Sequence, residues 1–142
     1  MSKESLKRRF PSLFRTPFKV TSFPDDTYNC VAWAMHDNTN WWEPHGQAYW
    51  PIVDRDVSFT GYLKMFEAVG FERCSTGDPE EGYEKIAVFA DQDGGFSHVA
   101  RHKQLKFWTS KCGQADDISH HLESLEGDLY GQVKVFMKRR TQ

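Results

Sequence analysis

The sequence predicts one α+β domain, in which N-terminal helices pack on a small, mostly antiparallel sheet. Three observations support this class. The chain has 142 residues, which lies within the usual size of a single domain. Helical patterns dominate its first half and strand patterns its second half. Strands and helices do not alternate, so a doubly wound parallel sheet is not expected.

Composition narrows the classes of function. The 18 Lys and Arg residues nearly balance the 20 Asp and Glu residues, so the net charge of -2 gives no general attraction to nucleic acid or to an anionic membrane. No stretch approaches the roughly 18 apolar residues of a membrane span. The three cysteines, Cys30, Cys74 and Cys112, cannot all pair within the chain. We therefore expect a cytoplasmic location, with export by a leaderless route as the alternative.

The N-terminal half predicts an arm, a short helix and an aromatic loop. The first 27 residues form an irregular arm in this prediction, and residues 28–142 form the single domain. Three prolines interrupt the arm, namely Pro11, Pro17 and Pro24. Residues 28–35 favour a helix that begins near Cys30, behind the N-cap candidates Asp25, Asp26 and Thr27. Residues 38–51 are rich in turn formers and tryptophan, which indicates a long loop.

The rest of the chain predicts two more helices and four strands. Apolar residues at helical spacing indicate a helix over 59–69, which Gly70 ends. Strands are expected over residues 85–90, 96–103, 107–110 and 133–137. The second and third of these form an antiparallel hairpin. Residues 118–125 indicate a short helix, capped by Asp116 or Asp117.

Cys30 and His98 are the residues most suited to catalysis. A thiol in the first turn of a helix meets unpaired N–H groups and the positive end of the helix dipole, which stabilise the thiolate. A nucleophilic thiol also needs a base, and His98 follows a Gly-Gly turn on an expected strand. The alternatives are a cysteine that packs as a small apolar residue and a histidine held by structural hydrogen bonds.

Two segments resemble a known superfamily. The segment YNCVAWA around Cys30 looks like the cysteine helix of the papain-like superfamily in its compact bacterial form, the NlpC-type peptidases and CHAP amidases. The segment FSHVA around His98 looks like their histidine strand. Seven segments between Tyr28 and Met137 are also similar to an uncharacterised bacterial family of small proteins and toxin-like modules: YNCVAWA, WW, YWP, FEAVGF, EKIAVFA, SHVAR and WTSKCG. The resemblance implies a papain-like fold and an amide hydrolase.

The resemblance also implies a third catalytic residue, about a dozen positions after the histidine. That interval lands on Ser110, whose hydroxyl accepts a hydrogen bond from the ring but supplies no negative charge. Asp117 and His120 are alternative residues to orient the His98 ring. Asp117 has a second interpretation, as the N-cap of the expected helix.

Asn29 and three tryptophans complete the candidate residues. Asn29 is a candidate to bind an oxyanion together with the backbone N–H of Cys30, or to cap the helix. Trp41, Trp42 and Trp50 offer flat faces to a substrate or partner, or they fold the loop onto the core. The HExxH and CxxC spacings of metal sites are absent from the sequence, so neither a metal nor a cofactor is expected.

The sequence leaves two functions open. In the first, Cys30 attacks an amide carbonyl of a peptide, protein or cell-wall substrate, His98 transfers the proton, and water resolves the thioester. In the second, the chain is a weak or inactive papain-like binding module, such as an effector or a phage-associated protein, and recognises its partner through the tryptophan-rich loop. A fast-reacting Cys30 would favour the first function.

Overall fold

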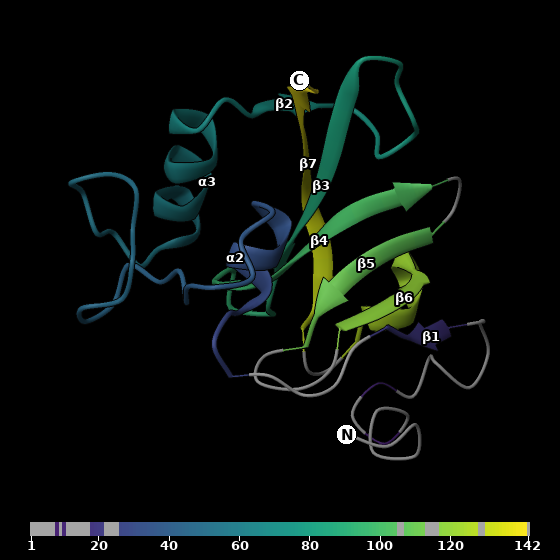
Figure 1. Ribbon diagram of the computed structural model, residues 1–142, viewed down its shortest axis with the longest axis horizontal. Helices are drawn as coiled ribbons and strands as arrows, with labels where there is room; N and C mark the ends of the chain where they lie inside the picture. The colour runs from purple at the N-terminus through teal and green to yellow at the C-terminus, as the bar shows by residue number, and fades with distance from the viewer. Residues whose placement is uncertain are drawn as a thin grey trace.

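The computed structural model describes residues 8, 10, 18–21, 26–104, 107–112, 117–127 and 130–141. Its strands are β1 (Phe18–Val20), β2 (Glu72–Cys74), β3 (Tyr83–Ala90), β4 (Phe96–Gln104), β5 (Phe107–Lys111), β6 (Asp117–His121) and β7 (Gln132–Arg140). They form one sheet of seven strands in the order β1-β6-β5-β4-β3-β7-β2, and all the pairings are antiparallel (Figure 1).

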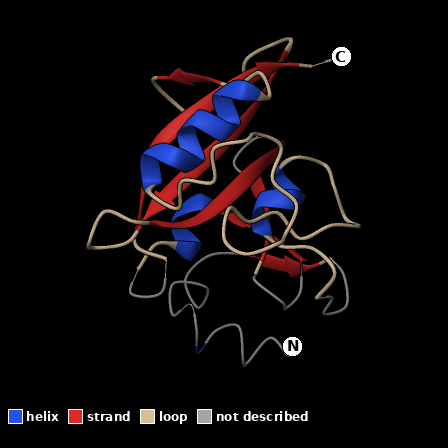
Figure 2. Cartoon of the chain, turned by 90° about the vertical axis from the view of Figure 1, so that its left-hand side faces the viewer, coloured by secondary structure: helices blue, strands red, loops and turns tan. Residues whose placement is uncertain are grey.

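The fold class differs from the predicted one. The described α-helices are short, α2 (Cys30–Ala34) and α3 (Phe59–Ala68), and α3 packs on one face of the long strands (Figure 2). The molecule is thus a β-rich fold, and the prediction of an α+β domain with helices packed on a small sheet was wrong. The sheet has three strands more than the four expected, because β1 and β2 extend its two edges and β6 forms inside it. Three-residue strands of this kind leave no periodic signal in a sequence.

Two further segments differ from their predicted structure. Residues Phe18–Val20 of the expected irregular arm form β1, where Phe18 lies opposite His120 of β6. The expected helix over 118–125 is instead β6, followed by a single 3-10 turn, η2 (Leu122–Leu125). Hydrogen bonding to β5 and β1 on both sides outweighs the helical spacing of the apolar residues there. The three prolines of the arm, with Asp25 and Asp116, lie outside the described residues.

The helix α2 begins at Cys30 because Asn29 caps it. The backbone of Asn29 is extended, and its Oδ1 accepts a hydrogen bond of 3.1 Å from the N–H of Ala32. Beyond Ala34 the chain turns through His36, whose φ of 62° is left-handed and therefore uncommon for a residue other than glycine. This early turn limits α2 to five residues.

The helix α3 matches the helix predicted over 59–69. Ser58 caps it, because its Oγ accepts a hydrogen bond of 3.1 Å from the N–H of Gly61. Leu63 and Phe66 are buried against the sheet. Gly70 adopts a φ of 107° and ends the helix. No helix in the described part of the chain has the length and apolar content that a membrane span needs.

The sheet separates two groups of buried side chains. The helix-side group includes Ile86, Val88, Val99, Met137 and the buried residues of both helices. The far-side group includes Ala87, Phe89, Ala100, Trp108, Ile118 and Tyr130. Neighbours along a strand alternate between the two groups, as the pleat of a strand requires. The face on which a residue lies therefore decides which functional groups it meets.

Candidate functional site

Cys30 lies at the start of α2, on the helix side of the sheet. The residue is half-buried, and the backbone N–H groups of Val99, Val31 and Cys30 itself are directed at its sulfur. Burial raises the pKa of the Cys30 thiol to about 11, although these N–H groups and the charge of Lys111 oppose the rise. The thiol is therefore protonated at neutral pH, and a thiol is a poor nucleophile.

His98 is buried on the far side of the sheet. Its ring stacks on Tyr130, with centroids 4.1 Å apart and an angle of 5° between the planes. Its Nε2 lies 2.9 Å from Oγ of Ser110. Burial lowers the pKa of His98 well below its usual value, and the neighbouring His120 lowers it further. The neutral ring is thus the stable form.

Ser110 joins two histidines in what we call the histidine–serine chain, composed of His98, Ser110 and His120. Oγ of Ser110 lies 2.7 Å from Nε2 of His120, whose Nδ1 lies 2.7 Å from the carbonyl oxygen of His121. A carbonyl oxygen only accepts, so Nδ1 of His120 carries the proton, and its Nε2 accepts from the Ser110 hydroxyl. Ser110 then accepts from Nε2–H of His98. The predicted contact between Ser110 and His98 is present, while its catalytic role stays a prediction.

Cys30 and His98 contact opposite faces of the sheet. Cys30 packs against the helix-side group, as does Val99. The His98 ring packs on Phe89 and Tyr130 of the far-side group. Successive side chains of β4 alternate, so Val99 faces α2 and its neighbour His98 does not. The structure therefore does not bring the predicted nucleophile and base together.

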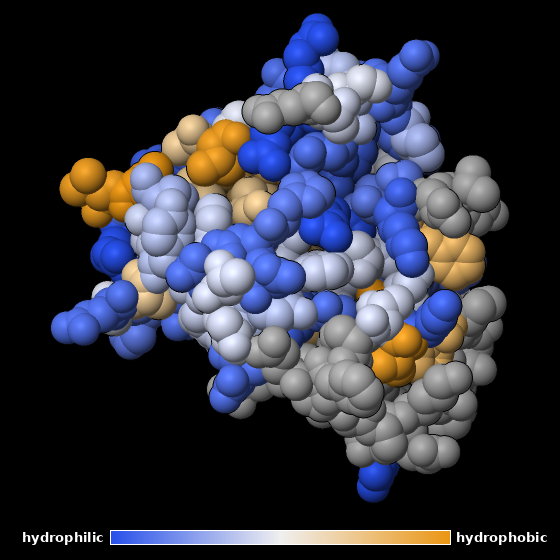
Figure 3. All heavy atoms as spheres, in the orientation of Figure 1, coloured by the Kyte–Doolittle hydropathy of each residue, from blue (hydrophilic) through white to orange (hydrophobic). Residues whose placement is uncertain are grey.

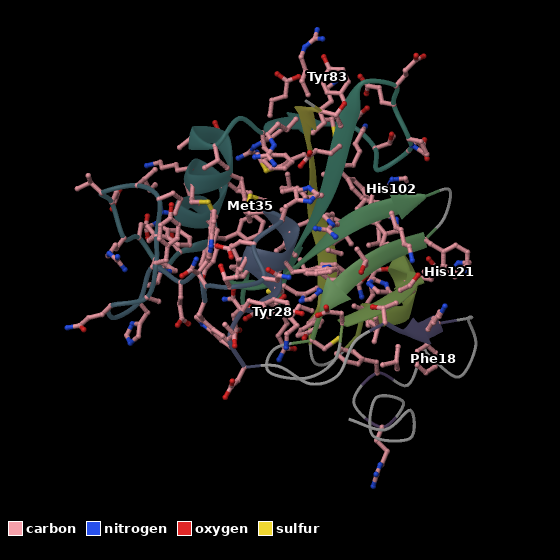
Figure 4. The ribbon with its side chains drawn as sticks, viewed as in Figure 1. Phe18, Tyr28, Met35, Tyr83, His102 and His121 are labelled. Atoms are coloured by element: carbon pink, nitrogen blue, oxygen red, sulfur yellow. The ribbon has the colours of Figure 1, made fainter. Side chains whose placement is uncertain are left out.

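Asp117 makes a different contact from either predicted one. It lies on β6, where its Oδ2 accepts a hydrogen bond of 2.6 Å from the hydroxyl of Tyr28, which Figure 4 shows beside α2. Asp117 therefore neither orients His98 nor caps a helix. The residue opposite it on β5 is Lys111, which is buried with its Nζ 5.1 Å from the centre of the Tyr28 ring. Sequence reasoning missed Lys111, because a lysine beside a turn is usually exposed.

The amide of Asn29 is engaged by two neighbours. Its Oδ1 accepts hydrogen bonds from the N–H groups of Ala32 and Trp42, at 3.1 and 3.2 Å. Its Nδ2 donates to the carbonyl of Trp42 at 2.7 Å. Of its two predicted roles, the cap is the one that these contacts support. The side chain also ties α2 to the loop that follows it.

Residues 38–57, which we call the aromatic loop, are folded onto the core by two tryptophans. Trp42 and Trp50 are buried. The indole N–H of Trp42 donates to Oδ2 of Asp37 at 2.7 Å, and that of Trp50 donates to a backbone carbonyl of the loop at 3.1 Å. Trp41 is half-buried. The flat faces of Trp42 and Trp50 thus serve the core and are not open to a substrate or partner.

The chemistry of this region favours hydrogen bonding over nucleophilic attack. It offers a half-buried, protonated thiol on one face of the sheet and two neutral, buried imidazoles on the other. Within the described ranges, no group of three or more His, Cys, Asp or Glu side chains is placed to hold a metal ion.

Comparison with known proteins places the chain in a family. The model of a family described as a domain of unknown function, DUF7689, matches residues 19–138. No curated protein and no solved structure matches the chain. Since the matched segment covers most of its length, the chain belongs to the DUF7689 family.

Proposed function

We propose that the chain is a recognition module that binds a protein partner through the aromatic loop. The observation that carries this proposal is the exposure of three apolar side chains on one loop. Val53 is fully exposed, and Val57 and Tyr49 expose 60% and 49% of their surface. These are the large apolar side chains that are exposed among the described residues. Apolar groups that gather on one surface element are typical of protein contact sites.

The aromatic loop is held in one conformation by its own contacts. The N–H of Glu43 donates to the carbonyl of Tyr49 at 3.0 Å, and Nη1 of Arg55 donates to the carbonyl of Gly46 at 3.3 Å. The rings of Trp42 and Tyr49 lie 4.9 Å apart. A loop that is ordered before it binds loses little conformational entropy on binding. The exposed side chains are therefore presented at a low entropic cost.

The surroundings of these side chains suit a protein surface. An apolar area lies at the left-hand edge of the molecule in Figure 3, where Figure 1 places the loop before α3. Asp54 and Arg55 lie between Val53 and Val57 in the sequence, so charged groups of both signs border the apolar ones. Protein interfaces commonly combine an apolar centre with a polar rim. A membrane surface would instead select clustered Lys and Arg.

Photo-crosslinking in cells that make the protein tests this function. A photoreactive amino acid replaces Val53, and in a matched control it replaces Glu81, which is exposed on the loop before β3. We expect one adduct of defined mass from position 53 and none from position 81. Equal patterns from the two positions, or no adduct from position 53, would contradict the proposal.

A thiol-dependent amide hydrolase is the second candidate, and the hydrogen bond between His98 and Ser110 favours it. In this function His98 takes the proton of the Cys30 thiol, and the thiolate attacks the amide carbonyl. The expelled amine takes that proton back from His98, and water then cleaves the thioester. For the first step α2 must move relative to β4, because Cys30 and His98 contact opposite faces of the sheet.

The pH dependence of Cys30 alkylation separates the two functions. Mass spectrometry after brief treatment with iodoacetamide gives the rate at Cys30, with the half-buried Cys74 of β2 as the comparison thiol. For the recognition module the rate at Cys30 should rise with a midpoint near pH 11, as the raised pKa of its thiol requires. A midpoint below the ordinary thiol value of about 8.5 would instead support the hydrolase.

A further inference from the structure

A cavity of about 410 Å³ lies on the helix side of the sheet, next to α2 and over β4, β5 and β6. Trp33 of α2 forms one wall, and Arg101 and Lys103 of β4 form another. Thr109 and Asp117, from the two following strands, also line it. No residue of the aromatic loop or of the histidine–serine chain lines this cavity.

The guanidinium of Arg101 is fixed in place at this cavity. Its Nη1 donates to the carbonyl of Trp33 at 2.8 Å and contacts Nδ1 of His36 at 3.0 Å. The group also stacks over the Trp33 indole, 4.3 Å from the ring centre. Trp33 is held in turn by its Nε1–H, which donates to Oγ1 of Thr109 at 3.3 Å. The orientation of Arg101 is thus set by protein contacts before any ligand binds.

Part of this guanidinium has no partner. Nε and Nη2 of Arg101 make no hydrogen bond to any described residue, and no described carboxylate lies within ion-pair distance of it. These two nitrogens form the edge of the guanidinium that matches a carboxylate or phosphate bidentately. Burial disfavours the charged guanidinium, and the carboxylates of Glu84 and Asp117 oppose this from a distance without bonding Nε or Nη2. A bound anion at that edge would reduce the cost of burial further.

Two other groups that line the cavity, Lys103 and Thr109, also favour a bound anion. The Lys103 side chain is exposed at the rim. Thr109 accepts from Trp33, so its hydroxyl proton is left to donate. The Asp117 carboxylate is the one negative lining group, and it accepts from the Tyr28 hydroxyl and faces Lys111 across the strands. The lining thus carries two cations and one carboxylate, while Glu84, which also acts on Arg101, is paired with Arg139.

We propose that this cavity binds an oxyanion group, a carboxylate or a phosphate, of a small molecule, with Nε and Nη2 of Arg101 as its bidentate anchor. Lys103 closes over the anion from the rim, and the Thr109 hydroxyl donates to it from the floor. The indole of Trp33, which stacks on the planar guanidinium, keeps the anchor oriented. The site is independent of the aromatic loop, so the chain would hold a small anion and a protein partner at separate places.

NMR titration of the full chain tests the site. The ¹⁵N-labelled protein is titrated with inorganic phosphate and, separately, with acetate, at constant ionic strength set by chloride. The reporters are the indole N–H of Trp33 and the Nε–H of Arg101. We expect both signals to shift and saturate with at least one of the two anions, and the tighter one identifies the preferred chemistry. Shifts that follow salt concentration without saturating would overturn the proposal.

Variants decide whether Arg101 is the anchor. Arg101→Gln should weaken binding at least about tenfold, because it removes a charged, bidentate donor. Arg73→Gln removes an equal charge from the exposed edge strand β2 and should leave the affinity unchanged. Arg101→Lys keeps the positive charge but loses the bidentate donor geometry of the guanidinium, so it should also bind the anion more weakly. This variant replaces Arg101→Gln in the test if Arg101→Gln does not fold. Wild-type affinity in the folded Arg101 variants would overturn the assignment.

Discussion

Two histidines on the far side of the sheet make the free energy of unfolding depend on pH. His98 and His120 are buried and neutral, and burial lowers the pKa of His120 to about 4, against 6.5 for a free imidazole. The pKa of His98 is lowered in the same direction. Below pH 6.5 the unfolded chain therefore binds more protons than the folded one. Their contribution to stability is complete above that pH and is lost as the pH falls towards the folded pKa values.

Acid should therefore weaken the fold well above the pH at which carboxylates titrate. From pH 6.5 to 4, His120 alone should lower the free energy of unfolding by about 3 kcal/mol, because one pKa unit corresponds to about 1.4 kcal/mol. Urea unfolding at several pH values measures this loss. His120→Gln should flatten the pH dependence, whereas His45→Gln, at an exposed position, should not. Equal slopes in the two variants would contradict the role of His120.

The residue types of the candidate site were more predictable than their mutual placement. The N-cap of Asn29 and the position of Cys30 at a helix start follow from local sequence, and the contact of Ser110 with His98 follows from the interval that the family resemblance implies. The face that His98 occupies does not. It depends on the phase of β4, which is set by a bulge where the partner strand passes from Phe89 to Ala90, and a shift of one residue exchanges the faces.

At the scale of elements, α2 and the aromatic loop form one unit through Asn29. The same amide caps α2 and holds both the N–H and the carbonyl of Trp42. The helix start and the first limb of the loop are consequently fixed by one side chain. The exposed apolar residues of the loop depend on this connection for their position.

Removal of the Asn29 amide should cost more than the loss of an ordinary helix cap. Asn29→Ala should lower the free energy of unfolding by about 2–4 kcal/mol, since a cap contributes about 1 kcal/mol and unsatisfied buried groups of Trp42 add about 1–3. Ser58→Ala removes the cap of α3 alone and should cost only about 1 kcal/mol. Chemical denaturation compares the two. If both variants lose the same stability, Asn29 acts only as a cap.

Helices and strands with a clear apolar pattern in the sequence could be predicted. Strands that form only because a neighbouring strand is available to pair with them could not. The apolar run at 85–90 lies within β3, and the helix over 59–69 is present as α3. Residues 118–125 have helical spacing, but β6 gains hydrogen bonds to strands on both sides. The three-residue strands β1 and β2 exist only because an edge of the sheet is available to pair with them.

For the whole molecule, the large antiparallel sheet separates the candidate activities. The aromatic loop and the Arg101 cavity belong to the helix side, whereas the histidine–serine chain is enclosed on the far side. The predicted α+β class was wrong because the sheet is larger and the helices are shorter than the sequence pattern indicates. Cys30 and His98 contact opposite faces of that sheet. Because Cys30 and His98 are apart, we base the proposed function on the aromatic loop and its exposed apolar side chains.

The most direct test of this account is the yield of the crosslinked adduct from position 53 in two further variants. Cys30→Ala removes the thiol, and Val57→Asp places a charge in the exposed apolar surface of the loop. Recognition through the aromatic loop predicts an unchanged adduct in Cys30→Ala and its loss in Val57→Asp. Loss of the adduct in Cys30→Ala, with a normal yield in Val57→Asp, would show that the partner is engaged through the thiol and would contradict the account.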